Sequence, residues 1–519
     1  MSFRAKELVL PVLRYGLLWT LALVLSACQP NQDPETLNIS GPFEFTSQDP
    51  SRTGYVYTRL QVAETLVEVA PDGHLLPGLA EYWSAEDGGL RWQFQLRSGV
   101  RFHDGQVLEA QTVVQALEIA RTKPGILNTL PITQITAEEP LKLSIQLSRP
   151  HQPLPAVLAH FSAVILSPAS YNAEGQVTWM QGTGPYRLIE FGPPHRLLVQ
   201  RFEGYWGKVA QIPKVLYLTG HRAESRALQV MAGQTDIVYT LDPASLDLLK
   251  RRKDAQVHSE LIPRTIQIKL NAGHPYLKDL KARQAISLAL DRSGIATHVL
   301  RVPGTEANQL IPPMLKDWHL PALAPIAQDL KQAQALLQEL GWQADEQGIL
   351  HREGQRFQLK MITYADRPEL LVIGTAIQAQ LRALGIDMGL SVVNSSGIPS
   401  AHHDGSLELA LIARNYGTVA DPLSLLLLDF GAQGNGDWGG MNWNNTAFPQ
   451  LLHELEAEQD ATLYQRKAQQ AAQMLVDELP AIPVLFYTQQ TATAQRVKHF
   501  SFDPYERNYH LSDMRLATP

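Results

Sequence analysis

Cysteine is almost absent from this chain of 519 residues, in which Cys28 is the only one. A single thiol excludes a disulfide within the chain and a zinc site built from several thiolates. Long apolar runs are equally scarce. After the first thirty residues no segment reaches the length of about 18 consecutive apolar residues that a membrane-spanning helix needs, which excludes a polytopic membrane protein.

An excess of basic charge is also missing, because 44 Lys and Arg face 51 Asp and Glu, for a net charge of −7. This balance lacks the basic surface expected of a protein that binds nucleic acid. The 35 Gly and 34 Pro are spread along the chain, and 45% of the residues are hydrophobic, which excludes collagen, a coiled coil and low-complexity disorder. At about 100–200 residues per domain, the length fits roughly three packing units.

Common catalytic motifs are missing as well. The sequence contains no HExxH, no P-loop, no GxSxG and no GxGxxG that follows a strand pattern. A lone cysteine close to the N-terminus gives no candidate for thiol catalysis. We therefore expect a protein that is not an enzyme and carries no cofactor. A hydrolytic pair of carboxylates is the one catalytic arrangement that the abundant Asp and Glu leave open.

The N-terminal residues have the pattern of an export signal. Basic Arg4 and Lys6 precede an apolar stretch over residues 15–27, which is too short to span a bilayer comfortably. Leu25-Ser26-Ala27-Cys28 resembles a bacterial lipobox, in which the cysteine becomes the lipidated first residue of the mature chain. An ordinary cleaved signal and a signal anchor with an incidental cysteine are the alternatives.

We accordingly expect a signal peptide over residues 1–27, a lipid anchor on Cys28 and a polar tether over residues 28–35. Several acyl chains hold a protein stably at a membrane, since each buried CH₂ contributes about 0.8 kcal/mol. The mature protein is then a soluble body in the periplasm, anchored to a membrane of the cell envelope.

Strand and helix patterns alternate along the remaining chain, without an internal repeat. Period-two alternation predicts strands over 90–96, 141–147 and 357–363. Helical spacing predicts helices over 111–121, 224–231, 280–290, 328–340, 371–384 and 464–478. The mixture indicates an α/β or α+β fold.

Six short segments, in the same order, resemble the peptide/nickel family of extracytoplasmic solute-binding proteins, which are the receptors of ABC importers. The segments are Leu96–Gly105 (LRSGVRFHDG), Gly182–Arg187 (GTGPYR), Arg201–Gly207 (RFEGYWG), Ala232–Ile237 (AGQTDI), Lys281–Arg292 (KARQAISLALDR) and Leu336–Trp342 (LLQELGW). They lie between residues 96 and 342. Most of their residues have structural roles, such as glycines at hairpin corners, so the family resemblance comes from the scaffold and not from a site.

The resemblance implies an α/β fold with two lobes, like that of periplasmic binding proteins, with an enlarged first lobe and a ligand cleft between the lobes. The first lobe comprises residues 36–262, with an extra subdomain, and a C-terminal return over 484–519; the second lobe comprises 263–483. The chain would cross near Ile262-Pro263 and near residues 480–483. Two crossings suit hinge closure over a solute, and preference of the ligand for the closed state signals to the transporter.

The resemblance also implies ligand contacts from the second lobe. The segment Ala413–Pro422 (ARNYGTVADP) resembles the family's RxWGxxxDP loop, which faces the cleft. Arg414 would bind a solute carboxylate in bidentate fashion, and Asp421 would meet an ammonium group. Tyr416 takes the place of a tryptophan and keeps an aromatic face. The alternative is that Arg414 and Asp421 pair with each other or cap the next element.

Aromatic residues are the other ligand candidates. Trp438 and Trp443 lie in a Gly-rich segment where the family has a substrate-lining loop, and they could form a wall of the cleft, although Trp443 is the better candidate for packing inside the lobe. Tyr55, Tyr57 and Arg59 lie where the family's N-terminal loop borders the ligand. Two tyrosines at i and i+2 share one face of a strand, so both could instead be core residues.

A metal site formed by the protein itself is not expected. In the nickel receptors of the family a histidine follows the Asp-Pro pair, whereas this chain has Leu423 there. His402 and His403 are adjacent, and on an extended segment they would point to opposite faces. A metal would instead arrive inside an organic chelate whose carboxylates meet Arg414 and whose rings lie on the tryptophans.

We therefore expect a lipid-anchored solute receptor of an ABC importer, which binds a short peptide or a peptide-like, metal-chelating compound by closing its lobes. Its partners would be that solute, the importer permease and a membrane, with no nucleic acid, and the protein would be a monomer. The alternatives are a receptor for a nickel complex with a metallophore and a ligand-sensing lipoprotein that has lost transport. A transcriptional sensor is disfavoured because no helix-turn-helix precedes the body of the chain.

Overall fold

The computed structural model describes residues 33–431 and 436–517. The predicted signal peptide over 1–27, the lipidation site Cys28 and most of the tether lie outside the described residues. Within the described part, no helix is both long and apolar enough to cross a membrane.

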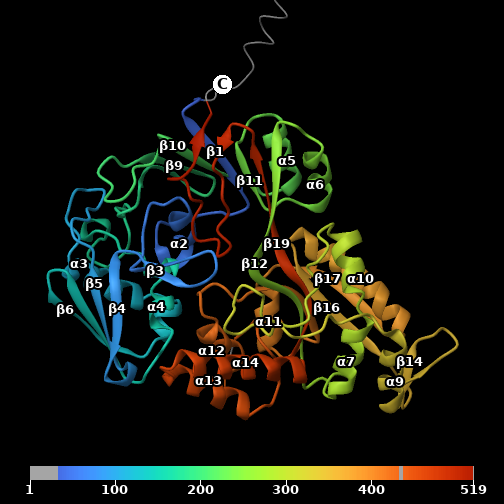
Figure 1. The fold of residues 1–519 in the computed structure, drawn as a ribbon. Helices are drawn as coiled ribbons and strands as arrows, with labels where there is room; N and C mark the ends of the chain where they lie inside the picture. Colours follow the sequence, from blue (N-terminus) through green and yellow to red (C-terminus); the bar gives the residue numbers. More distant parts are fainter. Residues whose placement is uncertain (1–32, 432–435, 518–519) are drawn as a thin grey trace, which may run out of the picture.

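A ten-stranded mixed sheet runs through the whole molecule (Figure 1). Its strands, in spatial order, are β17 (Asp387–Val393), β16 (Gln358–Tyr364), β18 (Leu409–Asn415), β12 (Ala255–Leu270), β19 (Ala481–Ala494), β11 (Ile237–Tyr239), β1 (Thr36–Gly41), β10 (Lys214–Thr219), β9 (Arg196–Arg201) and β8 (Tyr186–Gly192). The long antiparallel strands β12 and β19 join its two halves.

The pairing of β12 with β19 is interrupted in the middle. Residues 255–261 pair with 488–494 and residues 265–269 pair with 481–486, and the register shifts between the two stretches. Pro263 lies in this break, where a residue without a backbone N–H removes a possible ladder bond. We call the part that contains residues 33–261 and 488–517 the first lobe, and residues 264–487 the second lobe.

The second lobe has two cores. Helices α7, α9 and α10 cover strands β16, β17 and β18 over one core, and helices α12, α13 and α14 form the other with Trp318 and Tyr416. The bounds are α7 (Leu280–Ala289), α8 (Arg292–Gly294), a π-helix over Ile295–Val299, α9 (Leu330–Glu339), β13 (Gln343–Ala344), β14 (Leu350–Arg352), β15 (Gln355–Arg356), α10 (Pro368–Leu384), α11 (Gly397–His403), α12 (Leu423–Phe430), α13 (Ala447–Ala457) and α14 (Ala461–Glu478).

The first lobe also has separate cores. One lies under β1, β8, β9 and β10, where α2 and the C-terminal residues pack, and a small one lies between α5, α6 and β11. The strand β1 is buried along its whole length because parallel strands flank it on both sides. The bounds are α2 (Pro50–Arg59), β2 (Val67–Val69), β3 (Leu75–Pro77), α5 (Ala223–Met231), α6 (Pro243–Lys250), β20 (Val497–Lys498) and β21 (Arg515–Leu516).

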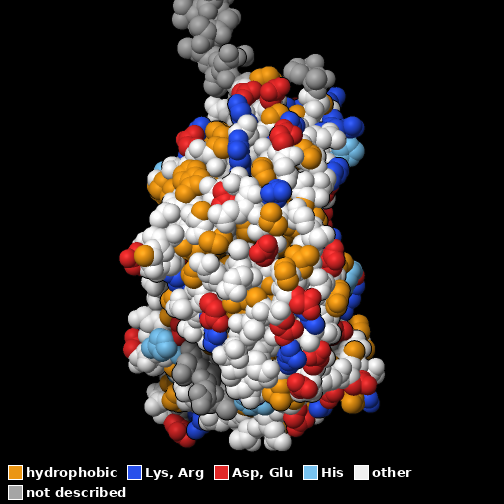
Figure 2. All heavy atoms as spheres, turned by 90° about the vertical axis from the view of Figure 1, so that its left-hand side faces the viewer, with side chains coloured by type: hydrophobic (Ala, Val, Ile, Leu, Met, Phe, Trp, Pro, Cys, Tyr) orange, Lys and Arg blue, Asp and Glu red, His pale blue; other side chains and the backbone are white. Residues whose placement is uncertain are grey.

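A four-stranded antiparallel sheet extends the first lobe at the left of Figure 1. Its order is β4-β5-β7-β6, and α3 packs on it. Figure 2 looks at the molecule from that side, and acidic, basic and hydrophobic side chains are interspersed on this face. The bounds are β4 (Ala80–Glu86), β5 (Arg91–Leu96), α3 (Ala110–Arg121), β6 (Ile132–Glu139), β7 (Lys142–Leu147) and α4 (Leu154–Val157), with short 3₁₀ turns at Asp87–Gly89, Ile126–Thr129, Phe161–Ala163 and Pro168–Ser170.

The predicted periodicities are confirmed by these elements. The three predicted strands correspond to β5, β7 and β16, and the six predicted helices to α3, α5, α7, α9, α10 and α14. In β5 every second residue is buried, because one face of this sheet packs on the core and the other faces outward.

Candidate functional site

A large cavity lies between the two lobes. Its volume is about 1100 Å³, and it is bounded by residues 125–160 of the first lobe and residues 418–457 of the second. This volume is slightly larger than the range of about 300–1,000 Å³ for small-molecule sites, so a ligand of several residues or rings fits. Its apolar lining includes Ile126, Leu130, Val419, Leu425, Leu427 and Leu428.

A charged cluster lies at the edge of this cavity, centred on Glu456 of α13. Its Oε1 accepts a hydrogen bond from His151 Nδ1 at 3.0 Å and also pairs with Arg149, and its Oε2 accepts one from His453 Nδ1 at 2.9 Å. The Glu456 side chain is only 3% exposed. Burial alone raises its pKa, but the hydrogen bonds from His151, Arg149 and His453 outweigh this and lower the pKa to about 2. Glu456 is therefore ionised at neutral pH.

These contacts connect the two lobes. Arg149 and His151 belong to the first lobe, whereas Glu456 belongs to the second. The backbone N–H of Gln152 also donates to the Glu456 carbonyl oxygen at 2.8 Å, and Ser424 Oγ lies 3.3 Å from His151 Nε2. We call Arg149, His151, Ser424, His453 and Glu456 the inter-lobe cluster. It joins the walls of the cavity directly.

His160 lines the cavity as a neutral ring. The backbone N–H of Ser162 donates to its Nδ1 at 3.2 Å, so the proton of the neutral imidazole lies on Nε2. Burial lowers the pKa of His160 to about 3, which keeps the ring uncharged at neutral pH. His160 is therefore an uncharged member of the cavity lining.

Arg414 is held by a carboxylate of its own lobe. Its Nε and Nη2 donate to the two carboxylate oxygens of Asp429, each at 2.7 Å. The pair is largely buried, with 15% of the Arg414 side chain exposed and 1% of that of Asp429. The predicted alternative partner, Asp421, does not meet Arg414. It accepts a hydrogen bond from the Leu423 N–H at the start of α12, and the Tyr464 hydroxyl donates to its other oxygen at 2.6 Å.

Tyr416 is completely buried, and its hydroxyl donates to the Gln267 side chain at 2.8 Å. It packs in the core of α12–α14 and is not among the residues that line the large cavity. The neighbouring Thr418 and Val419 do line the cavity, so the loop after β18 contributes to this site through its later residues.

Both tryptophans pack against the core under β16–β18, and Trp443 also contacts the core of α12–α14. Trp443 Nε1 donates to Glu478 at 2.7 Å, and its ring packs at 5.2 Å from that of Phe448. Trp438 is half-buried and meets Tyr364 edge-to-face at 5.9 Å between ring centroids. Neither ring lines the large cavity.

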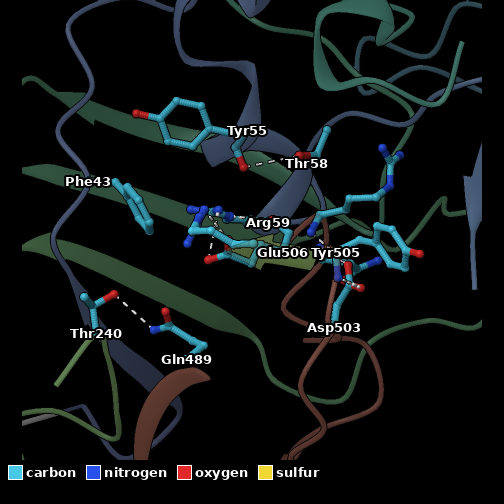
Figure 3. Close-up of polar contacts among 12 residues, drawn as sticks. Phe43, Tyr55, Thr58, Arg59, Thr240, Gln489, Asp503, Tyr505 and Glu506 are labelled. Carbon is cyan, nitrogen blue, oxygen red and sulfur yellow. Dashed lines mark hydrogen bonds and ion pairs between the residues drawn. The ribbon is translucent and has the colours of Figure 1, made fainter. Parts of the chain in front are cut away.

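Tyr55, Tyr57 and Arg59 lie on helix α2 and not on a strand. At about 100° per residue, positions i and i+2 point to different sides of a helix, so the two tyrosines do not share a face. Tyr57 is buried, and its hydroxyl donates to the Ser47 carbonyl at 2.7 Å. Tyr55 is half-buried beside Phe43, and the Arg59 guanidinium lies 4.2 Å from the centroid of the Phe43 ring (Figure 3).

Arg59 belongs to a buried polar network next to the break in β12. Its Nε donates to the backbone carbonyl of Glu506 at 2.6 Å (Figure 3), and Arg264 donates to the carboxylate of the same residue at 2.9 Å. Burial raises the pKa of Glu506, but the positive charges of Arg264, Arg59 and Arg367 outweigh this effect and lower the pKa. The C-terminal segment is thereby tied to both lobes.

The residues that the structure adds to the site are those of the inter-lobe cluster, His160 and Thr418. His151 and Glu456 are separated by 305 positions in the sequence, and no local pattern marks either of them. Only Thr418 lies inside a segment that sequence reasoning selected.

Comparisons with known proteins agree with this architecture. A family model described as "Bacterial extracellular solute-binding proteins, family 5 Middle" matches residues 74–437. The nickel-binding protein NikA of Staphylococcus aureus is 23% identical over 97% of this chain and 99% of its own length. The dipeptide-binding protein of Escherichia coli is 22% identical over 84% of this chain and 85% of its own length.

Among solved structures, NikA from Brucella suis in complex with Fe(III)-EDTA superposes with a TM-score of 0.85 at 22% identity. The superposition covers 93% of this chain and all of that one. This likeness confirms the predicted α/β fold with two lobes.

Proposed function

Because this chain belongs to the bacterial extracellular solute-binding proteins of family 5, we propose that it is the solute receptor of an ABC importer. Its ligand is a short peptide or a peptide-like, metal-chelating compound, held in the cavity between the lobes. The observation that carries the proposal is this cavity of about 1100 Å³, whose walls come from both lobes. The lobes are connected by β12 and β19, and a ligand that contacts both walls favours the closed state.

The chemistry of the walls suits an organic anion. The leucines and isoleucine cover its apolar parts, and the neutral His160 ring lies among them. The Arg149 side chain is 50% exposed although it pairs with Glu456, so part of its guanidinium is accessible to a solute carboxylate.

The second candidate is a receptor for a nickel complex. The observation in its favour is that His151, His160 and His453 all line the cavity. Imidazole is a good ligand for Ni²⁺, so one of these rings could fill a coordination position that an organic chelate leaves open. The family relatives include proteins named for nickel and for dipeptides.

The proposal also includes the cellular setting predicted from the N-terminal sequence. The protein is lipidated at Cys28, faces the periplasm and works as a monomer with an importer permease. The family consists of solute-binding receptors, and an enzymatic activity is not part of the proposal. The lobes turn about the break near Pro263, opposite Tyr487 of β19. A ligand-sensing lipoprotein would bind the same solute, but its deletion would leave solute uptake unchanged.

Binding by isothermal titration of di- and tripeptides, nickel–histidine and other amino-acid chelates tests the proposal. Thr418→Trp places an indole at the cavity wall and should abolish binding of any solute that the natural protein takes. Thr462→Trp, at an exposed position of α14, is the matched control and should bind normally. Absence of binding by the natural protein to every compound, or full binding by Thr418→Trp, would overturn the assignment to this cavity.

A further inference from the structure

Three potential metal ligands from distant parts of the chain gather on the first lobe. Glu44 lies before α2, His195 in the turn between β8 and β9, and His221 two residues after the end of β10. One ligand atom from each lies within 4.8 Å of the others, and His221 Nε2 is 3.4 Å from a Glu44 carboxylate oxygen. The two imidazole rings are 5.3 Å apart between centroids. All three side chains are exposed, so an ion can reach them.

The backbone holds these three segments together. The N–H of Thr219 donates to the His195 carbonyl at 2.9 Å, and the Thr219 hydroxyl donates to the Phe43 carbonyl, also at 2.9 Å. The Gly220 N–H donates to the Gly41 carbonyl at 2.9 Å. The ligands therefore stand on an ordered scaffold, which reduces the conformational entropy lost on binding an ion.

The position in the sheet is also favourable. Gly41 and Thr219 are paired at the carboxyl ends of the parallel strands β1 and β10, and Glu44 and His221 follow these ends within three residues. Ligands of open α/β sheets bind beyond the carboxyl ends of parallel strands. Arg196, the cation next to His195, is engaged with Glu190 through a 2.7 Å hydrogen bond and does not occupy the cluster.

We propose that Glu44, His195 and His221 form a metal site for a divalent transition-metal ion, such as Zn²⁺ or Ni²⁺. Two imidazoles and a carboxylate suit these borderline ions better than Ca²⁺ or Mg²⁺, which prefer oxygen ligands. Three protein ligands leave coordination positions for water or an external group. The site is independent of the solute cavity, because none of the three residues lines that cavity.

Isothermal titration with ZnCl₂ and NiCl₂ in a buffer free of chelators tests the site. The natural protein should bind one ion there. Glu44→Gln, His195→Ala and His221→Ala should each weaken binding by at least about tenfold, because losing even a hydrogen-bond partner of a metal ligand costs about 10–100-fold in affinity. His298→Ala, which removes another exposed histidine, and His402→Ala, which breaks the adjacent histidine pair, should leave the affinity unchanged.

A structural readout completes the test. Anomalous scattering from zinc-soaked crystals should place the ion about 2.0–2.2 Å from one oxygen and two nitrogens of these residues. Thermal melting without metal verifies that each variant is folded. Unchanged affinity in all three variants, or an anomalous peak only at His402 and His403, would overturn the proposal and leave His221 and Glu44 as an ordinary surface ion pair.

The outcome is distinguishable from that of the proposed function. Thr418→Trp should lose solute binding and keep the zinc site, whereas His221→Ala should lose the zinc site and keep solute binding. If the natural protein binds no solute but retains the site, the metal inference stands while the receptor proposal fails.

Discussion

Replacing Arg414 by alanine tests whether this side chain stabilises the second lobe or binds the solute. The structure pairs it with Asp429 through two charge-assisted hydrogen bonds of 2.7 Å, in a place where Asp429 is 1% exposed. Removing one partner of a buried ion pair leaves the other charge without compensation, at a cost of about 3–5 kcal/mol. Because Arg414 is 15% exposed, we expect a loss near the lower limit, about 3 kcal/mol in the free energy of unfolding.

The pH dependence adds a second signature. Burial already raises the pKa of Asp429, with Arg414 acting against it. Without Arg414 the folded-state pKa of this carboxyl rises further, so the folded protein binds a proton more readily than the unfolded chain. Stability then falls as the pH rises. The deficit of Arg414→Ala should therefore be larger at pH 8 than at pH 5.

Urea titration followed by tryptophan fluorescence measures the effect, with Asp429→Asn and the double variant completing a thermodynamic cycle. The double variant should recover part of the loss, because it no longer buries an unpaired charge. Normal stability of Arg414→Ala combined with a large loss of solute affinity would refute this reasoning and support the ligand role that the sequence suggested.

Three further predictions concern other buried groups. Burial lowers the pKa of Lys269 from its usual 10.5 to about 7, so stability should rise with pH between these values, and Lys269→Met should flatten the stability–pH profile from unfolding curves. Glu456→Gln should weaken the inter-lobe cluster and increase the radius of gyration in small-angle scattering. In the natural protein, the stabilisation by charged Glu456 is complete above about pH 4.5 and should fade as the pH falls toward about 2. Gly182→Ala should destabilise by more than about 2 kcal/mol in urea unfolding, since its Cβ would lie 2.1 Å from the Val62 carbonyl, whereas the open Gly389→Ala should be nearly neutral.

The periodic elements could be predicted from the sequence because their pattern is local. The alternation in residues 91–96 follows from a sheet with one buried face, and the spacing in α14 follows from one apolar helix face. Helix α2 was not predicted from its local pattern. Its Gly54 weakens the helix pattern, but a Cβ there would lie 2.7 Å from the Phe161 carbonyl, a close approach that a residue over one hundred positions away determines.

The site was harder to predict because its residues meet only after folding. The sequence placed Arg414 and Asp421 in one loop, and the choice between pairing, capping and ligand binding depended on where Asp429 lies. The helix α12 brings Asp429 back beside Arg414, and Asp421 instead accepts a hydrogen bond from the Leu423 N–H at the start of that helix. His151 and Glu456 carry no local signal at all, since their meeting depends on how the two lobes approach each other.

The interrupted pairing of β12 with β19 near Pro263 bears on how fast a bound solute dissociates. The pairing of β12 with β19 shifts register twice, between residues 261 and 265 and again between 266 and 267. Under the proposed closure of the lobes, we expect bending to concentrate at these irregular positions while each lobe moves as a rigid body. If the lobes close about this position, residues there influence how long a solute stays bound without contacting it. Substitutions at these positions would then change the rate of solute release to a transporter while the residues that contact the solute stay the same.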